Sequence, residues 1–137
     1  MSANREPLLD FETDGPVHIG TIKFSSVLSA ANVAEFGQEV LNYIKAHPKL
    51  NLLLSFENVD YLSSAVLTEL LRINSAIEES KGTLRLCAIS PVIREVFEIT
   101  NLDSVFTLHA DSVEKDLKRF HRAIEIAEQE QAWTDKK

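Results

Sequence analysis

Residues 50–71 read LNLLLSFENVDYLSSAVLTELL, and this stretch decides the fold. The run from 50 to 56 is apolar on both faces, which is typical of an interior strand covered on two sides. After a polar link over 57–60, apolar residues recur at helical spacing from about Ser64 to Ser80. An interior strand that leads directly into an amphipathic helix indicates an α/β fold.

The same alternation continues on both sides of this stretch. Residues 8–13 and 17–24 have strand character, and Asp14-Gly15-Pro16 between them predicts a hairpin. The other expected elements are a helix over 30–46, a strand over 83–88, a helix opening at Ser90 and Pro91, a strand over 105–108 and a final helix opening at Asp111.

The resulting order is two strands, three alternations of helix and strand, and a last helix. It predicts right-handed crossovers and a single, mostly parallel sheet of about five strands with about four helices. The N-terminal hairpin would place an antiparallel strand at one edge. The loops over 25–29, 57–63, 89–90 and 109–111 would gather at the carboxyl ends of the parallel strands, where open α/β sheets bind ligands and partners.

Length and composition limit the function. A chain of 137 residues suggests one domain over 1–137, with a core over about 8–125 and with 126–137 as a frayed helix end and tail. A net charge of −7 argues against nucleic acid as a partner. One cysteine and four scattered histidines show no metal-ligand spacing, so no metal is expected. No apolar run reaches the ~18 residues of a membrane span, and we expect a cytoplasmic protein.

Hydroxyl side chains gather in the segments expected at that sheet edge: Ser25, Ser26, Ser29, Ser63, Ser64, Ser90 and Ser112. Serine is a favoured N-cap, and we interpret Ser29, Ser90 and Ser112 in this way. Ser63 has a second interpretation, because a helix amino terminus tolerates the negative charge of a phosphate.

Catalysis finds little support in the residues. Four glycines cannot build a glycine-rich phosphate loop, and no cofactor is expected. A small serine hydrolase that pairs Ser63 with His109 is the alternative of a different class. It would also need an orienting third group and an oxyanion hole.

Two stretches resemble the STAS domain family, and within it the bacterial anti-sigma factor antagonists. Residues 58–67, NVDYLSSAVL, are similar to the family's short link, aromatic residue and Asp-Ser-Ser-Gly-Leu motif, with Leu62 in place of Asp and Ala65 in place of Gly. Residues 86–97, LCAISPVIREVF, followed by TNL at 100–102, resemble the family's strand, Ser-Pro link and next helix. The order of elements fits over about 8–125.

The resemblance implies a regulatory binding module without enzyme activity. In the antagonists, the first serine of the motif is phosphorylated by an ATP-dependent serine kinase that is also the anti-sigma factor, and the phosphate blocks binding to that kinase. The matching residue is Ser63. Its contact surface would comprise seven neighbours: Asn58, Asp60, Tyr61, Leu62, Ser64, Ala65 and Thr68. A secondary loop surface would add Ser25, Ser26 and Ser90.

The two departures from the motif, Leu62 and Ala65, change the local charge and stiffness. They bear on phosphorylation more than on the fold. A second function within the family is that of a stand-alone scaffold subunit in a transporter or a stressosome-like assembly.

Overall fold

The computed structural model describes residues 7–23, 28–29 and 31–135. The strands are β1 (Leu9–Asp14), β2 (Val17–Ile22), β3 (Asn51–Ser55), β4 (Thr83–Cys87) and β5 (Thr107–Leu108). The helices are α1 (Val33–Ala46), α2 (Ser64–Glu79), α3 (Pro91–Ile99), the short 3-10 helix η3 (Leu102–Ser104) and α4 (Val113–Asp135). The α/β fold with four α-helices that the sequence predicts is confirmed.

The five strands form one sheet in the order β1-β2-β3-β4-β5. β1 pairs antiparallel with β2, and every other neighbouring pair is parallel. The hairpin turn is the two-residue loop Gly15-Pro16, closed by the pair of Asp14 and Val17. Gly15 has a φ of 60°, and glycine in the first position of a two-residue loop is what a type II′ turn requires. The expected antiparallel edge hairpin is therefore confirmed.

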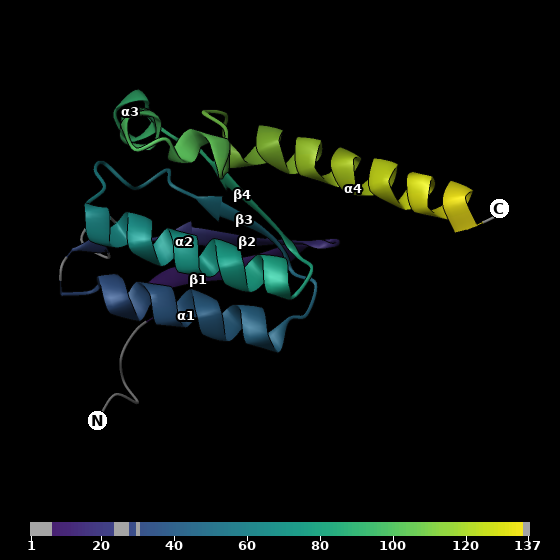
Figure 1. Cartoon of the computed structure of the whole chain (residues 1–137), viewed down its shortest axis with the longest axis horizontal. Helices are drawn as coiled ribbons and strands as arrows, with labels where there is room; N and C mark the ends of the chain where they lie inside the picture. The colour runs from purple at the N-terminus through teal and green to yellow at the C-terminus, as the bar shows by residue number, and fades with distance from the viewer. Residues whose placement is uncertain (1–6, 24–27, 30, 136–137) are drawn as a thin grey trace.

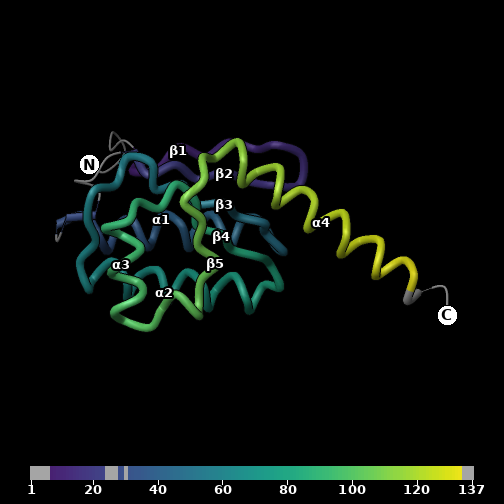
Figure 2. Tube along the Cα trace, turned by 90° about the horizontal axis from the view of Figure 1, so that it is seen from above, coloured from purple at the N-terminus to yellow at the C-terminus, as the bar shows by residue number. Residues whose placement is uncertain are grey.

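The sheet separates two layers of helix. α1 and α2 lie side by side on one face, and α4 crosses the other face (Figure 1). Seen from above, α4 runs over the middle strands and continues past them (Figure 2). β3 has no polar face because both of its faces are buried. Leu52 and Leu54 enter the larger core cluster, and Leu53 enters the smaller cluster beneath α4.

Several boundaries differ from the expectation. α1 begins at Val33, three residues later than expected, and its N-cap is Asn32 rather than Ser29. The last strand is only Thr107–Leu108, because η3 and the turn after it occupy the residues before it. Phe24 lies outside the described residues.

The start of α4 also differs from the expectation, because the helix begins at Val113 and not at Asp111. Ser112 Oγ accepts a hydrogen bond from the Lys115 backbone N–H at 3.4 Å, which confirms the interpretation of Ser112 as a cap. At the other end, the helix continues to Asp135.

The link from α2 to β4 divides two roles between neighbouring residues. Lys81 takes the left-handed conformation that ends the helix, with φ of 64°. Gly82 makes the close approach, because a Cβ there would lie 2.2 Å from the carbonyl oxygen of Leu50. The left-handed backbone therefore falls on the lysine and the close contact on the glycine.

Candidate functional site

Ser63 is the N-cap of α2. Its backbone is extended, with φ of −102° and ψ of 167°, and its Oγ accepts a hydrogen bond from the Val66 N–H at 3.4 Å. The side chain is nevertheless exposed. The hydroxyl is therefore accessible from solvent and stands at the positive end of a 16-residue helix.

The segment before Ser63 is tied to the sheet and the core. Asn58 Nδ2 donates to the carbonyl oxygen of Ile22 at 3.1 Å, which fixes the segment to the end of β2. Val59 is buried, and Leu62 is half-buried against the larger core cluster. The side chain of Tyr61, by contrast, is 50% exposed. The link is thus anchored from below and presents its aromatic residue to solvent.

Most of the predicted contact residues form one exposed surface with Ser63. Exposed side chains belong to Asn58, Asp60, Tyr61, Ser64, Ala65 and Thr68. Ala65 is already helical, so the residue that replaces the motif glycine fits α2 without strain. Leu62 is the exception, because its side chain is half-buried against the larger core cluster. We refer to this surface, residues 58–68, as the Ser63 surface.

Ser90 belongs to the secondary loop surface predicted from the sequence and lies among the described residues. It caps α3, and its Oγ accepts a hydrogen bond from the Ile93 N–H at 3.3 Å. β3 and β4 are parallel neighbours, so the caps that follow them, Ser63 and Ser90, belong to the same end of the sheet. Ser25 and Ser26 lie outside the described residues.

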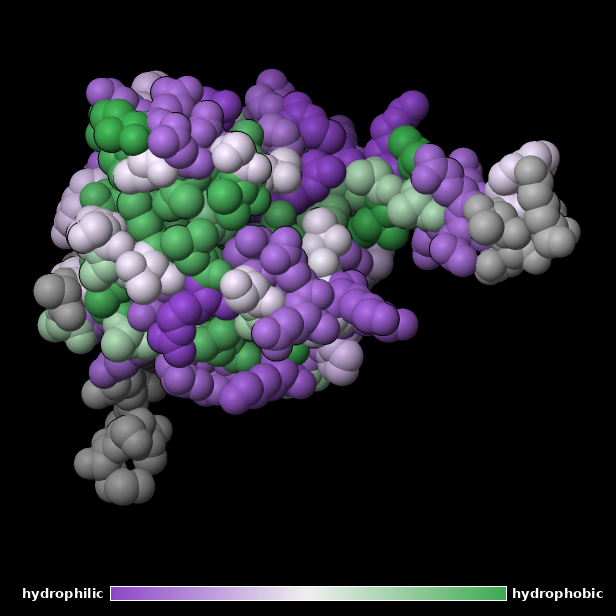
Figure 3. Space-filling view, viewed as in Figure 1, coloured by the Kyte–Doolittle hydropathy of each residue, from purple (hydrophilic) through white to green (hydrophobic). Residues whose placement is uncertain are grey.

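Exposed apolar side chains adjoin this end of the molecule. In α3 and the segment after it, Val92, Ile99 and Val105 are 62%, 72% and 46% exposed, and Leu71 of α2 is 38% exposed. Figure 3 shows apolar surface spread over the side of the molecule where α2 and α3 lie. This surface was not predicted from the sequence. The sequence does contain a sign of it, because Val92 and Ile99 fall off the helical stripe of Ile93 and Phe97, the two buried residues of α3.

A buried polar cluster joins the end of β5 to the start of α4. The Asp116 carboxylate has no exposed surface, and its Oδ1 contacts His109 Nδ1 and lies 3.1 Å from an Arg119 nitrogen. Arg119 also binds Asp111 at 2.6 Å, and this hydrogen bond lowers the pKa of the Asp111 carboxyl. Burial, followed by the nearby Asp116 charge, raises the pKa of the Cys87 thiol to about 12. The thiol therefore stays protonated.

This cluster bears on the hydrolase alternative. His109 Nδ1 is in contact with Asp116, and Ser63 Oγ accepts from its own helix. Within the part of the chain that the structure describes, no hydrogen bond joins Ser63 to His109. Serine hydrolysis needs a base beside the nucleophile, and the described structure does not pair His109 with Ser63 in this way.

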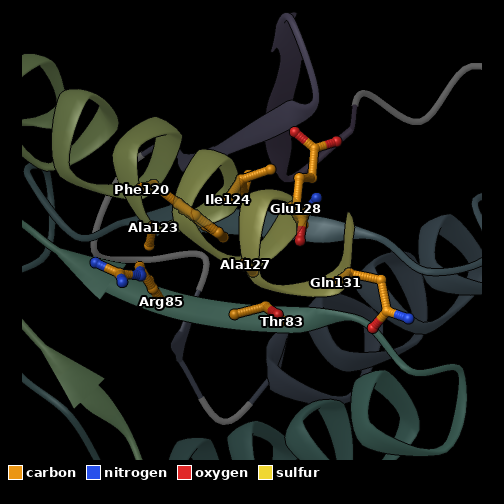
Figure 4. Close-up of a pocket in the computed structure, with 9 residues that line it drawn as sticks. Thr83, Arg85, Phe120, Ala123, Ile124, Ala127, Glu128 and Gln131 are labelled. Atoms are coloured by element: carbon orange, nitrogen blue, oxygen red, sulfur yellow. The ribbon is translucent and has the colours of Figure 1, made fainter. Parts of the chain in front are cut away.

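A hollow of about 300 Å³ lies elsewhere, between α4 and the first residues of β3 and β4. Figure 4 shows Phe120, Ile124 and Ala127 of α4 above Thr83 and Arg85 of the strand. These strand residues stand at the amino end of β4, whereas Ser90 follows its carboxyl end, so the hollow is separate from the Ser63 surface. Among the described residues, no group of three or more His, Cys, Asp or Glu is placed to hold a metal, and no helix has the length and apolarity to cross a membrane.

Comparison with known proteins gives consistent results. Residues 10–115 match the family model of the STAS domain. BtrV of Bordetella bronchiseptica strain RB50, whose name assigns it provisionally as an anti-sigma factor antagonist, is 31% identical over 98 residues, which are 72% of this chain and 83% of BtrV.

Solved structures share the fold at lower identity. The Thermotoga maritima protein tm1081, also provisionally named an anti-sigma factor antagonist, has a TM-score of 0.73 and 18% identity, over 82% of this chain and 94% of that one. The unphosphorylated anti-sigma factor antagonist SpoIIAA has a TM-score of 0.68 and 17% identity, over 82% and 96% of the two chains. A phosphorylated form of SpoIIAA from Bacillus has a TM-score of 0.61.

The family match covers most of the sheet, α1 to α3, the Ser63 surface and the start of α4. It includes almost all of the mixed sheet with its hairpin edge, and it includes Ser63, the serine that caps the amino terminus of α2. The chain therefore belongs to the STAS domain family.

Proposed function

We propose that this protein is a regulatory binding module of the anti-sigma factor antagonist type, which docks on an anti-sigma factor through the Ser63 surface. The main support for this proposal is that Ser63 combines an exposed hydroxyl, a place at a helix amino terminus and exposed apolar neighbours. Interfaces place aromatic and apolar groups at their centre, and Tyr61 and Val92 are exposed at this end of the molecule. The 31% identity to BtrV supports this assignment.

The partner in this proposal is an anti-sigma factor that is also a serine kinase. It transfers the γ-phosphoryl group of ATP to Ser63 Oγ, so that an O–P bond forms, the bond to the β-phosphate breaks, ADP leaves and the hydroxyl proton passes to a base on the kinase. The protein is then the substrate of the reaction and contributes no catalytic group.

The physical effect of the phosphate follows from its place. It adds a charge of about −1.5 to −2 at pH 7, and the N–H groups of the first turn of α2 accommodate that charge without unfolding the helix. In a complex, the same charge would be desolvated among apolar side chains such as Tyr61 and Leu71. An unpaired buried charge destabilises an interface strongly, so phosphorylation would release the partner.

Leu62 and Ala65 shape this site in a specific way. Leu62 packs on the core and brings no carboxylate next to the hydroxyl, so its replacement of Asp removes one source of repulsion toward an incoming phosphoryl group. Ala65 adds one methyl group to the exposed first turn. We therefore expect modification at Ser63 to be compatible with both residues.

The test is incubation with ATP and an anti-sigma factor kinase from the same organism, followed by intact mass and by a binding measurement. We expect one phosphoryl group on the wild type, none on Ser63→Ala, and one on the matched control Ser64→Ala. Ser63→Asp should bind the kinase at least tenfold more weakly than Ser63→Ala does. Unmodified Ser63 together with full binding by Ser63→Asp would refute the switch and leave a constitutive binding module.

Two further outcomes separate the alternatives. Capture of a transporter or a multi-subunit assembly from native lysate, with no anti-sigma factor, would favour a scaffold subunit. Labelling of Ser63 by a serine-reactive fluorophosphonate would favour hydrolysis. We do not expect labelling, since Ser63 lacks a link to His109 in the described structure. The identity to BtrV favours an anti-sigma factor over the scaffold outcome.

A further inference from the structure

The second half of α4 projects beyond the rest of the molecule, as both views of the chain show (Figures 1 and 2). Its first half is held down by Leu117 and Phe120, which pack in the smaller core cluster, and the last member of that cluster is Ile124. Beyond it, Ile126 is 46% exposed and Trp133 is 67% exposed. An isolated helix segment is only marginally stable in water, and an exposed tryptophan on the projecting half favours a covering surface.

The outward face of α4 carries a second stripe, separate from the one that packs on the sheet. Its six members recur at intervals of four, three, four, three and four residues: Lys115, Arg119, Arg122, Ile126, Gln129 and Trp133. This alternation is the heptad spacing by which two helices pack along a common seam. A shallow hollow on the projecting half is lined by Ile126, Gln129, Glu130 and Trp133, all on or beside this stripe.

Charge divides α4 into two halves of opposite sign. Residues 115–122 carry four cations, and their one carboxylate, Asp116, is buried and paired. Residues 123–133 carry three carboxylates, Glu125, Glu128 and Glu130, and no cation. Two such helices attract one another when they run antiparallel, because the basic half of each then faces the acidic half of the other. A parallel pair would oppose like charges along its whole length.

We propose that the outward stripe of α4 is the docking surface for a second copy of this chain, which pairs with it as an antiparallel helix around a two-fold axis near residue 124. This contact is isologous, so one stripe supplies both sides of the interface. In the heptad register centred there, Ile126 of each copy comes level with Arg122 of the other, and Trp133 comes level with Lys115. An ammonium group over an indole ring is a favourable contact in addition to the charge attraction.

The size of this surface sets the expected strength. One pair of short helices buries an area at the low end of specific interfaces, about 1,200 Å², so we expect a dissociation constant in the micromolar range. Part of the attraction is between exposed charges, so the dimer should weaken as salt is raised.

The first experiment is sedimentation velocity on the full chain over a range of concentrations. Wild type should pass from monomer to dimer, and Trp133→Ala and Ile126→Glu should each weaken the dimer at least tenfold. Ile99→Glu is the matched control, since it places the same charge at a 72% exposed isoleucine of α3 and should leave the dimer unchanged. Circular dichroism confirms that each variant keeps its helices. A monomer at all concentrations, or a dimer indifferent to Ile126→Glu, would overturn the proposal.

The second experiment tests the direction of the pair by oxidative cross-linking. The native Cys87 is fully buried, so it does not compete. Ile126→Cys lies near the two-fold axis and should cross-link to its copy, whereas Lys115→Cys should not, because the antiparallel arrangement separates its two copies by about 27 Å at 1.5 Å per helical residue. Cross-linking at both positions would mean a parallel pair and would refute the arrangement.

Discussion

The fully buried carboxylate of Asp116, on the first turn of α4, contacts the imidazole of His109 at the end of β5. Arg119 reaches the same Asp116 oxygen from one turn further along the helix. Because Asp116→Ala leaves His109 and Arg119 without the buried oxygen that both contact, we expect it to lower the free energy of unfolding by about 1–3 kcal/mol. Urea denaturation measures this change.

The control for that variant is Asp111→Ala, which removes the more exposed carboxylate held by the same Arg119. Exposed pairs contribute little, so its denaturation midpoint should stay close to that of the wild type. Equal losses from both variants would mean that Arg119, rather than the burial of Asp116, governs the attachment of α4.

The two capping serines predict a separation of stability from binding. Ser63→Ala and Ser90→Ala each remove an acceptor for a helix N–H, and each should cost about 1 kcal/mol of unfolding free energy. Ser63→Asp and Ser90→Asp keep an acceptor, so both should retain stability near the wild type. Only Ser63→Asp should lose the kinase partner. Loss of binding by Ser90→Asp as well would extend the interface to the mouth of α3.

The link after α2 predicts opposite effects at adjacent residues. Lys81→Gly removes a side chain from a residue with φ of 64° and should raise the free energy of unfolding by about 0.5–1 kcal/mol. Gly82→Ala places a methyl group 2.2 Å from the Leu50 carbonyl oxygen, which forces the backbone of β3 and β4 apart. We expect it to lower the thermal midpoint by several degrees. A stabilising Gly82→Ala would contradict this packing.

His18 predicts a loss of stability in mild acid. Burial, with a smaller contribution from the nearby His47, lowers the pKa of His18 below its usual 6.5, and its Nδ1 hydrogen-bonds the Tyr43 hydroxyl at 2.6 Å. The unfolded chain therefore takes up this proton first as pH falls below about 6.5. Stability is complete above that pH and declines on acidification toward the lowered pKa.

The measurement is urea denaturation of wild type and His18→Gln at pH 7.5 and pH 5.5. The difference between the two proteins isolates His18 from the other titrating groups. We expect His18→Gln to lose less stability than the wild type between these two pH values. An identical loss in both proteins would assign the acid sensitivity elsewhere.

The sequence predicts the order of elements well because apolar periodicity is strong in each of them. The doubly apolar run of β3 and the stripe of Val66, Leu70, Ile73 and Ile77 in α2 are examples, and all four of these α2 residues are buried. Ser63 and Ser90 were recognisable as caps because a serine stands directly before an apolar helix. Capping is a local interaction, so a short stretch of sequence contains most of its signal.

The failures concern contacts between distant segments. Ser112 was recognised as a cap, but the opening of α4 was placed at Asp111, whose carboxylate instead pairs with the distant Arg119. The partnership of His109 with Asp116 depends on how α4 folds back over the sheet, which periodicity does not encode. The exposure of Val92 and Ile99 is different, because both fall off the stripe of Ile93 and Phe97 and the sequence alone could have shown it.

The last strand, Thr107–Leu108, has a further consequence for how this molecule meets others. A strand at the edge of a sheet is a template for the strands of other chains, and a long one invites aggregation. Here the far edge offers only two residues, and the near edge is a hairpin strand whose side chains include Asp10, Glu12 and Asp14. Both borders therefore discourage strand addition, which leaves the loops and helices of this protein as its surfaces for recognition.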